Sequence, residues 1–174
     1  YEQWAKIHNL KQAAKTYNFL TTHGIEQYGD LIAKIAEVQT ASEQAAEALK
    51  DVEARLSDMA VLIKNITTYQ KTKAAYDAYR KAKDRGSYRA AHERNIILHE
   101  AAVKAIKGAG ISKLPDIAAL QTEYAKLQER KEALYTDYGK LKKQVKEYDV
   151  IKRNIDSILR QPREPEQEKG KERE

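Results

Sequence analysis

Apolar residues recur every seven positions along two long stretches of this sequence. A helix turns every 3.6 residues, so apolar spacings that alternate between three and four place those side chains on one face. Between residues 27 and 84 this pattern predicts one long helix with a coiled-coil-like seam. The seam is formed by two sets, first Leu31, Val38, Ala45, Val52, Met59 and Ile66, and second Ile35, Ser42, Leu49, Leu56 and Ile63.

The apolar stripe changes frame beyond Ile66, where it passes through Tyr69, Tyr76 and Tyr79. A frame change of this kind is typical of a stutter in a coiled coil or of a new packing partner. The sequence leaves both open, and also leaves open whether the helix is continuous past Ile66.

A second heptad pattern predicts another long helix over residues 115–160. Pro115 suits its first turn, and Asp116 suits the positive end of the helix dipole. Two lysines, Lys131 and Lys152, interrupt the seam. Its apolar positions are Leu120, Leu127, Leu134, Leu141, Tyr148 and Ile155, with Tyr124, Tyr138, Val145 and Leu159 between them.

Two shorter helices are expected over residues 2–22 and 87–107, the second with Ser87 as a plausible N-cap. We expect Ile97, Ala101, Ala105 and neighbouring apolar residues to form the buried side of the second short helix. In the first, one face is shared by Trp4, Ile7, Leu10, Ala14, Tyr17 and Leu20.

Each short helix is followed by a Gly-Ile pair, first Gly24-Ile25 and then Gly110-Ile111, offset by 86 positions. Glycine after a helix is typical of a left-handed C-terminal cap. The repeat divides the chain into a hairpin unit over 1–85, a second over 86–160, and a charged tail over 161–174 that we expect to be disordered. Duplication and convergence both explain it.

The sequence therefore predicts an all-α fold in which two long heptad-patterned antiparallel helices are flanked by two shorter helices, as an elongated helical bundle or coiled coil. An isolated helix is only marginally stable in water, so the seams need partners. A dimeric coiled coil is the competing arrangement.

Composition agrees with long helices, because charged residues make up 33% of the chain while Gly (7) and Pro (3) are scarce. With no Cys, disulfides and thiol chemistry are excluded. The chain begins in mid-pattern, so we expect it to be part of a longer protein. It shows no signal peptide and no apolar run that suits a membrane span, and we expect a bacterial cytoplasmic location without membrane contact.

The positive charge is concentrated in one segment. Residues 71–113 hold 11 Lys/Arg against 4 Asp/Glu, whereas the flanking stretches are close to neutral. A local basic patch is typical of a polyanion partner, although surface helices are also lysine-rich for solubility. The candidate phosphate contacts are Lys71, Lys73, Arg80, Lys81, Lys83, Arg85, Arg89 and Arg94.

No catalytic, metal or cofactor site is recognisable. His92 and His99 lie two helical turns apart, about 10 Å, too far to share one metal, and we interpret the histidines as surface residues. Carboxylates mostly lie beside Lys or Arg at helical spacing, as in exposed ion-pair faces. We therefore predict no enzyme activity for this chain.

Two long stretches of the sequence resemble a known protein family. "YEQWAKIHNLKQAAKTYNFLTTHGI" and "KLPDIAALQTEYAKLQERKEALYTDYGKLKKQVKEYDVIKRNIDSIL" are similar to the C-terminal region of relaxases, the mobilisation nucleases of conjugative elements of Firmicutes. Relaxases nick DNA through a tyrosine and a histidine-rich metal motif in an N-terminal domain. This chain has no His-x-His cluster, so no catalytic residue is carried over.

The resemblance implies a non-catalytic accessory region that assists conjugative transfer by binding DNA, or by docking relaxosome or coupling proteins. The alternative is a structural coiled-coil scaffold or homodimerisation module with no nucleic-acid role. The basic segment fits either DNA or an acidic protein surface.

Overall fold

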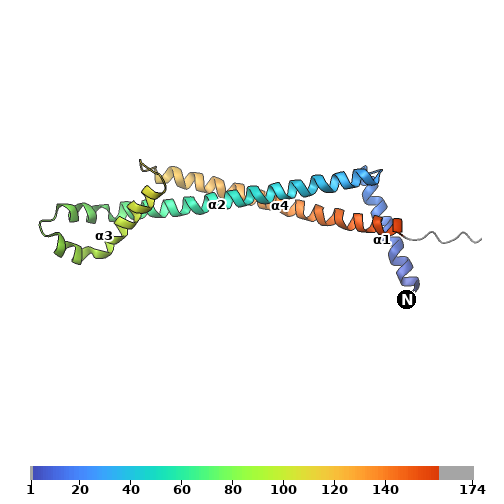
Figure 1. Ribbon diagram of the computed structural model, residues 1–174, viewed down its shortest axis with the longest axis horizontal. Coiled ribbons are helices and arrows are strands. Elements are labelled where there is room, and N and C mark those ends of the chain that lie inside the picture. The colour runs from blue at the N-terminus through green and yellow to red at the C-terminus, as the bar shows by residue number, and fades with distance from the viewer. Residues whose placement is uncertain (1, 161–174) are drawn as a thin grey trace, which may run out of the picture. The chain divides into compact units, whose positions relative to one another are not determined.

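The computed structural model describes residues 2–160, and Figure 1 shows the order of its helices. They are α1 (Glu2–Thr22), α2 (Tyr28–Lys81), α3 (Arg85–Gly108) and α4 (Ile117–Arg160). The predicted all-α fold of two long and two shorter helices is confirmed. Helix α2 is continuous past Ile66. The tail expected to be disordered, residues 161–174, lies outside the described residues.

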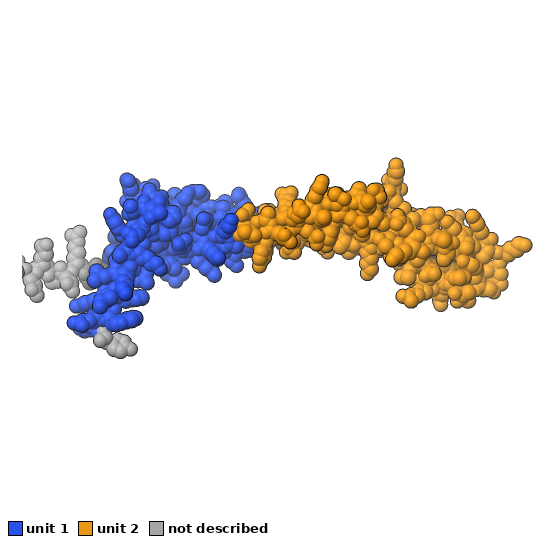
Figure 2. Space-filling model, turned by 180° about the vertical axis from the view of Figure 1, so that it is seen from behind, with its two compact units in different colours: residues 1–44, 138–174 blue, residues 45–137 orange. Residues whose placement is uncertain are grey.

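The chain forms two compact units, coloured separately in Figure 2. Unit 1 contains residues 1–44 and 138–174, and unit 2 contains residues 45–137. The boundary expected between residues 85 and 86 lies inside unit 2. Packing explains this arrangement, because each unit is formed by segments of α2 and α4 that are distant in sequence.

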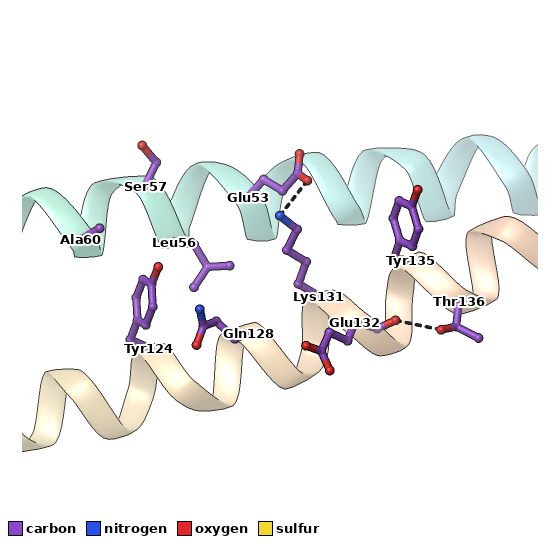
Figure 3. Close-up of a pocket in the computed structure, with 10 residues that line it drawn as sticks. All are labelled: Glu53, Leu56, Ser57, Ala60, Tyr124, Gln128, Lys131, Glu132, Tyr135 and Thr136. Atoms are coloured by element: carbon purple, nitrogen blue, oxygen red, sulfur yellow. Dashed lines mark hydrogen bonds and ion pairs between the residues drawn. The ribbon is translucent and has the colours of Figure 1, made fainter.

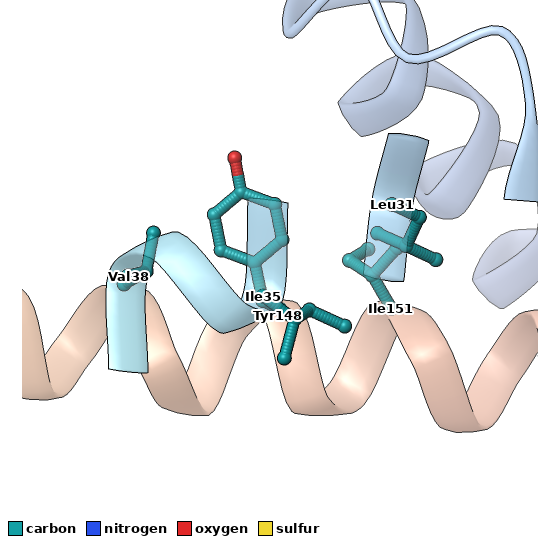
Figure 4. Close-up of a cluster of buried hydrophobic side chains, with 5 residues drawn as sticks. All are labelled: Leu31, Ile35, Val38, Tyr148 and Ile151. Carbon is teal, nitrogen blue, oxygen red and sulfur yellow. The ribbon is translucent and has the colours of Figure 1, made fainter. Parts of the chain in front are cut away.

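The core of unit 1 is an apolar cluster between α2 and α4, formed by Leu31, Ile35, Val38, Tyr148 and Ile151 (Figure 4). Leu31 is fully buried. Near one end of this contact the Tyr28 hydroxyl donates to the Asp156 carboxylate at 2.8 Å. The pairing of 28 with 156 and of 31–38 with 148–151 shows that the two segments run antiparallel, as predicted.

Helix α1 packs on the rest of unit 1 through a different face from the apolar face that the sequence predicts. Its buried or half-buried side chains include Thr16, Phe19 and Leu20. Thr16 satisfies its hydroxyl by donating to the Gln12 carbonyl at 2.8 Å and accepting from the Asn154 amide at 3.1 Å. Of the predicted apolar face only Leu20 packs on the core, and the other five residues are exposed.

In unit 2, α2 and α4 also run antiparallel. Arg55 pairs with Glu123 at 2.6 Å, and Glu53 pairs with Lys131 at 3.1 Å. The predicted seam is buried on the α2 side at Leu49, Val52, Leu56, Met59 and Ile66. Lys131 therefore occupies a seam position as an ion-paired residue. The second interruption is paired too, since Lys152 in unit 1 bonds Asp156 at 2.8 Å.

Helix α3 lies beside the C-terminal part of α2 within unit 2 (Figure 1). It is the new packing partner for the stripe beyond Ile66. The predicted buried side of α3 is wrong at its three named residues, because Ile97 is 49% exposed and Ala101 and Ala105 are also exposed. The buried positions are Ile96, His99, Ala102 and Ile106. This face contains a histidine, which a search for apolar periodicity treats as polar.

The cap of α3 also differs from the prediction. Its N-cap is Asp84, whose carboxylate accepts from the Ser87 backbone N–H at 3.1 Å and from the Ser87 hydroxyl at 2.7 Å. These hydrogen bonds lower the pKa of Asp84. In α4, Asp116 accepts from the Ala118 N–H at 3.3 Å and Pro115 precedes the first helical residue, Ile117.

The two Gly-Ile corners have the same hydrogen-bond pattern. Gly24 and Gly110 have φ of 64° and 75°. The Ile25 N–H donates to the Leu20 carbonyl at 2.9 Å, and the Ile111 N–H donates to the Ile106 carbonyl at 3.4 Å. Each glycine N–H also reaches a carbonyl three residues back. Both corners are therefore Schellman motifs, in which a left-handed residue closes the helix.

Replacing Gly24 by alanine is expected to lower the free energy of unfolding by about 1 kcal/mol or more, because L-residues are strained at positive φ. No atom lies within 4 Å of the added Cβ, so the cost is conformational. Gly139 provides the matched control, because it lies inside α4 with the same open space. Gly139→Ala should stabilise by up to about 1 kcal/mol. Urea unfolding followed by circular dichroism measures both, and equal effects of the two would contradict the corner geometry.

Candidate nucleic-acid interface

The connection between α2 and α3 brings four of the eight predicted basic residues together. Arg80 and Lys81 end α2, Lys83 lies in the turn, and Arg85 begins α3. The Arg85 guanidinium donates to the Arg80 carbonyl at 3.1 Å, which holds these two residues side by side. We call Arg80, Lys81, Lys83 and Arg85 the basic tip. All four are exposed.

The other four predicted residues divide into two kinds. Lys73 bonds Asp77 at 2.8 Å, and Arg89 bonds Glu100 at 3.2 Å. These pairs raise the pKa of Lys73 and of Arg89, mainly because each cation donates a hydrogen bond to its carboxylate, Asp77 or Glu100. Lys71 and Arg94 are exposed and make no ion pair within residues 2–160, and the same holds for the four residues of the basic tip. Six of the eight cations therefore remain available to a phosphate.

Arg89 has a structural role that its sequence position does not reveal. Its guanidinium lies 5.8 Å from the centre of the Tyr79 ring on α2 while it bonds Glu100 on its own helix. A cation over an aromatic face is attracted by the ring quadrupole. Arg89 thus holds α3 against α2 directly below the basic tip.

His99 lies between two tyrosines at the centre of the α2–α3 contact. Its ring stacks on Tyr69 with centroids 4.8 Å apart and on Tyr76 with centroids 4.3 Å apart. The Thr72 hydroxyl lies 2.9 Å from His99 Nδ1 and 2.7 Å from the Thr68 carbonyl. The hydroxyl has one hydrogen, so if it donates to the carbonyl, His99 Nδ1 must donate to the hydroxyl. The interpretation of His99 as a surface residue is therefore wrong, since only 3% of it is exposed.

Burial lowers the pKa of His99, although the carboxylates of Asp77 and Glu100 act in the opposite direction and Lys73 reinforces the lowering. The folded chain therefore favours the neutral ring, while the unfolded chain takes up a proton as the pH falls through the ordinary value of 6.5. The contribution of His99 to stability is complete above that value, and it is lost as the pH falls through the folded-state pKa.

We expect the free energy of unfolding to fall between pH 7.5 and about pH 5 partly because of His99. Urea unfolding at a series of pH values measures this slope. The His99→Phe variant keeps an aromatic ring between the tyrosines but cannot be protonated, so its slope should be smaller than that of the native chain. An unchanged slope would mean that His99 is not held neutral in the fold.

Helix α3 bends at His92, whose φ of −126° and ψ of 22° are not helical. The His92 ring stacks on Tyr88 one turn earlier, with centroids 4.3 Å apart. His92 is exposed and Tyr88 is half-buried. This pair places aromatic surface near the basic tip, on the same helix as Arg85.

An open groove lies within unit 2 of the described residues. The groove between α2 and α4 in unit 2 is open and is lined by the Glu53–Lys131 ion pair, Leu56, Tyr124 and Tyr135 among others (Figure 3). No group of three or more His, Asp or Glu that suits a metal ion occurs among residues 2–160. None of the described helices is long and apolar enough to cross a membrane.

Comparisons of this chain with protein-family models, with curated proteins and with solved structures find no match. The resemblance to relaxases thus stays a prediction.

Proposed function

We propose that this chain is a non-catalytic helical module that binds the phosphate backbone of DNA through its basic tip. In line with the sequence resemblance, we propose that it serves as an accessory region of a mobilisation relaxase. The observation that carries the DNA proposal is the gathering of Arg80, Lys81, Lys83 and Arg85 at one turn without carboxylate partners among the described residues.

Ion pairing supports this assignment because it separates two kinds of basic residue. Where the helices pack, Lys73 and Arg89 are paired with acidic neighbours, as structural cations usually are. Near the tip, the Asp84 carboxylate is engaged by Ser87, and the Asp77 carboxylate, one turn before Arg80 and Lys81, is engaged by Lys73. Arg80 and Lys81 also offset the negative end of the α2 dipole, which explains two of the four cations but not Lys83 or Arg85.

Contacts made by flexible, exposed lysines and arginines recognise phosphate and carry little sequence information. We therefore expect binding that is largely independent of sequence and falls steeply as salt is added. Lys71 and Arg94 lie on the two helices that lead to the tip and are expected to extend the contact.

Fluorescence anisotropy of labelled single- and double-stranded DNA tests the proposal. The purified chain should bind at micromolar concentrations in low salt and release the DNA as the salt is raised. Absence of binding at low salt would exclude a direct DNA role and favour a module that docks other proteins.

A further inference from the structure

Helix α1 has a second apolar face that the fold leaves uncovered. Its inner face, which includes Thr16 and Phe19, packs on unit 1, whereas the outer face points to solvent. Residues 2–11 are exposed on every side (Figure 1, dark blue). The outer face consists of Ile7 (52% exposed), Leu10 (70%), Ala14 and Tyr17 (70%), and the exposed Trp4 lies at its edge, on the side of Lys11 and Lys15.

The spacing of the apolar residues on this outer face indicates which kind of partner surface would fit it. Ile7, Leu10, Ala14 and Tyr17 are separated by three, four and three residues, which is the narrow stripe of a coiled-coil seam. Gln3 and Thr21 continue the same register at either end with polar side chains. Helices that lie in a membrane surface bury a broader apolar face. A single facing helix therefore fits the stripe better than a lipid surface.

The flanks of the stripe are basic. At 100° per residue, Lys6 borders one side, and Lys11 and Lys15 border the other. None of these three lysines makes an ion pair within the described residues. Glu2 is the one acidic residue of α1. A second copy of the chain would bring lysine against lysine along this seam, which opposes self-association.

We propose that the outer face of α1 binds an amphipathic helix of a partner protein whose apolar stripe is flanked by glutamate or aspartate. The apolar side chains of the partner would cover Ile7, Leu10 and Tyr17, and its carboxylates would pair with Lys6 and Lys11. Opposite charges beside a seam select the partner and its orientation. This surface is on α1 in unit 1, whereas the basic tip belongs to unit 2, so the proposal is argued from different residues than the DNA proposal.

Trp4 provides the readout, because it is the single tryptophan of the chain and lies at the edge of the proposed surface, beside Lys11 and Lys15. The probe is a synthetic helical peptide of four heptads with leucine at the seam and glutamate at the flanks. A matched peptide carries lysine at the flanks. The acidic peptide should shift Trp4 emission to shorter wavelength with micromolar affinity, and the basic peptide should bind at least about tenfold more weakly.

Two variants locate the site. Leu10→Asp should abolish the shift with the acidic peptide, whereas Val61→Asp, at a position that is 56% exposed on α2, should not. The triple variant Lys6→Glu, Lys11→Glu, Lys15→Glu should reverse the preference in favour of the basic peptide. This gain of binding cannot arise from unfolding of α1.

Four results would overturn the proposal. Equal binding of both peptides and binding of neither peptide would contradict the charge preference and the site itself. The third is an emission shift with vesicles of phosphatidylcholine and phosphatidylserine but not with the acidic peptide, which would make a lipid surface the occupant. The fourth is a concentration-dependent dimer that Leu10→Asp dissociates, which would make a second copy the occupant.

Discussion

Replacing Arg80, Lys81, Lys83 and Arg85 together by glutamate is expected to weaken DNA binding by at least about 100-fold, equivalent to about 3 kcal/mol. The reason is that each substitution removes a phosphate contact and adds a repelling charge at the same place. All four side chains are exposed, so the fold should be retained. Anisotropy with labelled double-stranded DNA measures the affinity, and circular dichroism checks the helices.

The matched control changes the net charge by the same amount elsewhere on the chain. It replaces four exposed basic residues of α4 by glutamate, namely Lys126, Arg130, Lys140 and Lys143. We expect this control to lower the affinity by less than about tenfold, through the long-range field alone. If both quadruple variants lose the same affinity, the total charge matters and the tip is not the site.

Leu31→Ala is expected to have the largest effect on stability, a loss of about 3 kcal/mol in the free energy of unfolding. Leu31 is fully buried in the cluster with Ile35, Val38, Tyr148 and Ile151, and its removal leaves a cavity between α2 and α4. Urea unfolding monitored by circular dichroism measures this loss.

The neighbouring residue supplies the control for Leu31. Ile32→Ala removes the same number of carbon atoms from the same helix, but Ile32 is 38% exposed. We expect it to cost less than half as much, since the loss follows the apolar area removed from water and the cavity created. Equal losses would show that the α2–α4 cluster does not exist in solution.

The long helices could be predicted from the sequence because burial and periodicity agree there. Leu31, Val38, Val52 and Ile66 all lie on the face that packs on another helix. Gly24 was informative for a similar reason, since a helix that ends in a left-handed residue strongly favours glycine. Both signals depend on local geometry, which the sequence encodes directly.

The short helices show where this reasoning fails. The heptad stripe of α1 through Leu10 and Tyr17 is stronger in sequence than the face through Thr16, yet the face through Thr16 is the buried one. On α3, His99 is buried by partners on another helix, Tyr69 and Tyr76. Burial of a polar residue depends on tertiary partners, and periodicity within one helix does not contain that information.

The location of the candidate interface could be predicted from the sequence, but not which of its basic residues are ion-paired. The excess of Lys and Arg marked the segment, yet it did not separate the ion-paired Lys73 and Arg89 from the basic tip. Arg89 and Glu100 are eleven residues apart, which is not a helical neighbour spacing, and the kink at His92 lies between them. The stacking of Tyr88 on His92 was likewise invisible in a pattern of charges.

The most direct test of phosphate binding by the tip is the salt dependence of DNA affinity for the native chain and for Lys81→Gln. Double-stranded DNA contributes a slope of about −0.9 per neutralised phosphate in a plot of log affinity against log salt concentration. Four to six contacts predict a slope of roughly −4 to −5, which Lys81→Gln should make shallower by about 0.9. An affinity that does not depend on salt, or a slope that Lys81→Gln leaves unchanged, would contradict the assignment of DNA binding to this tip.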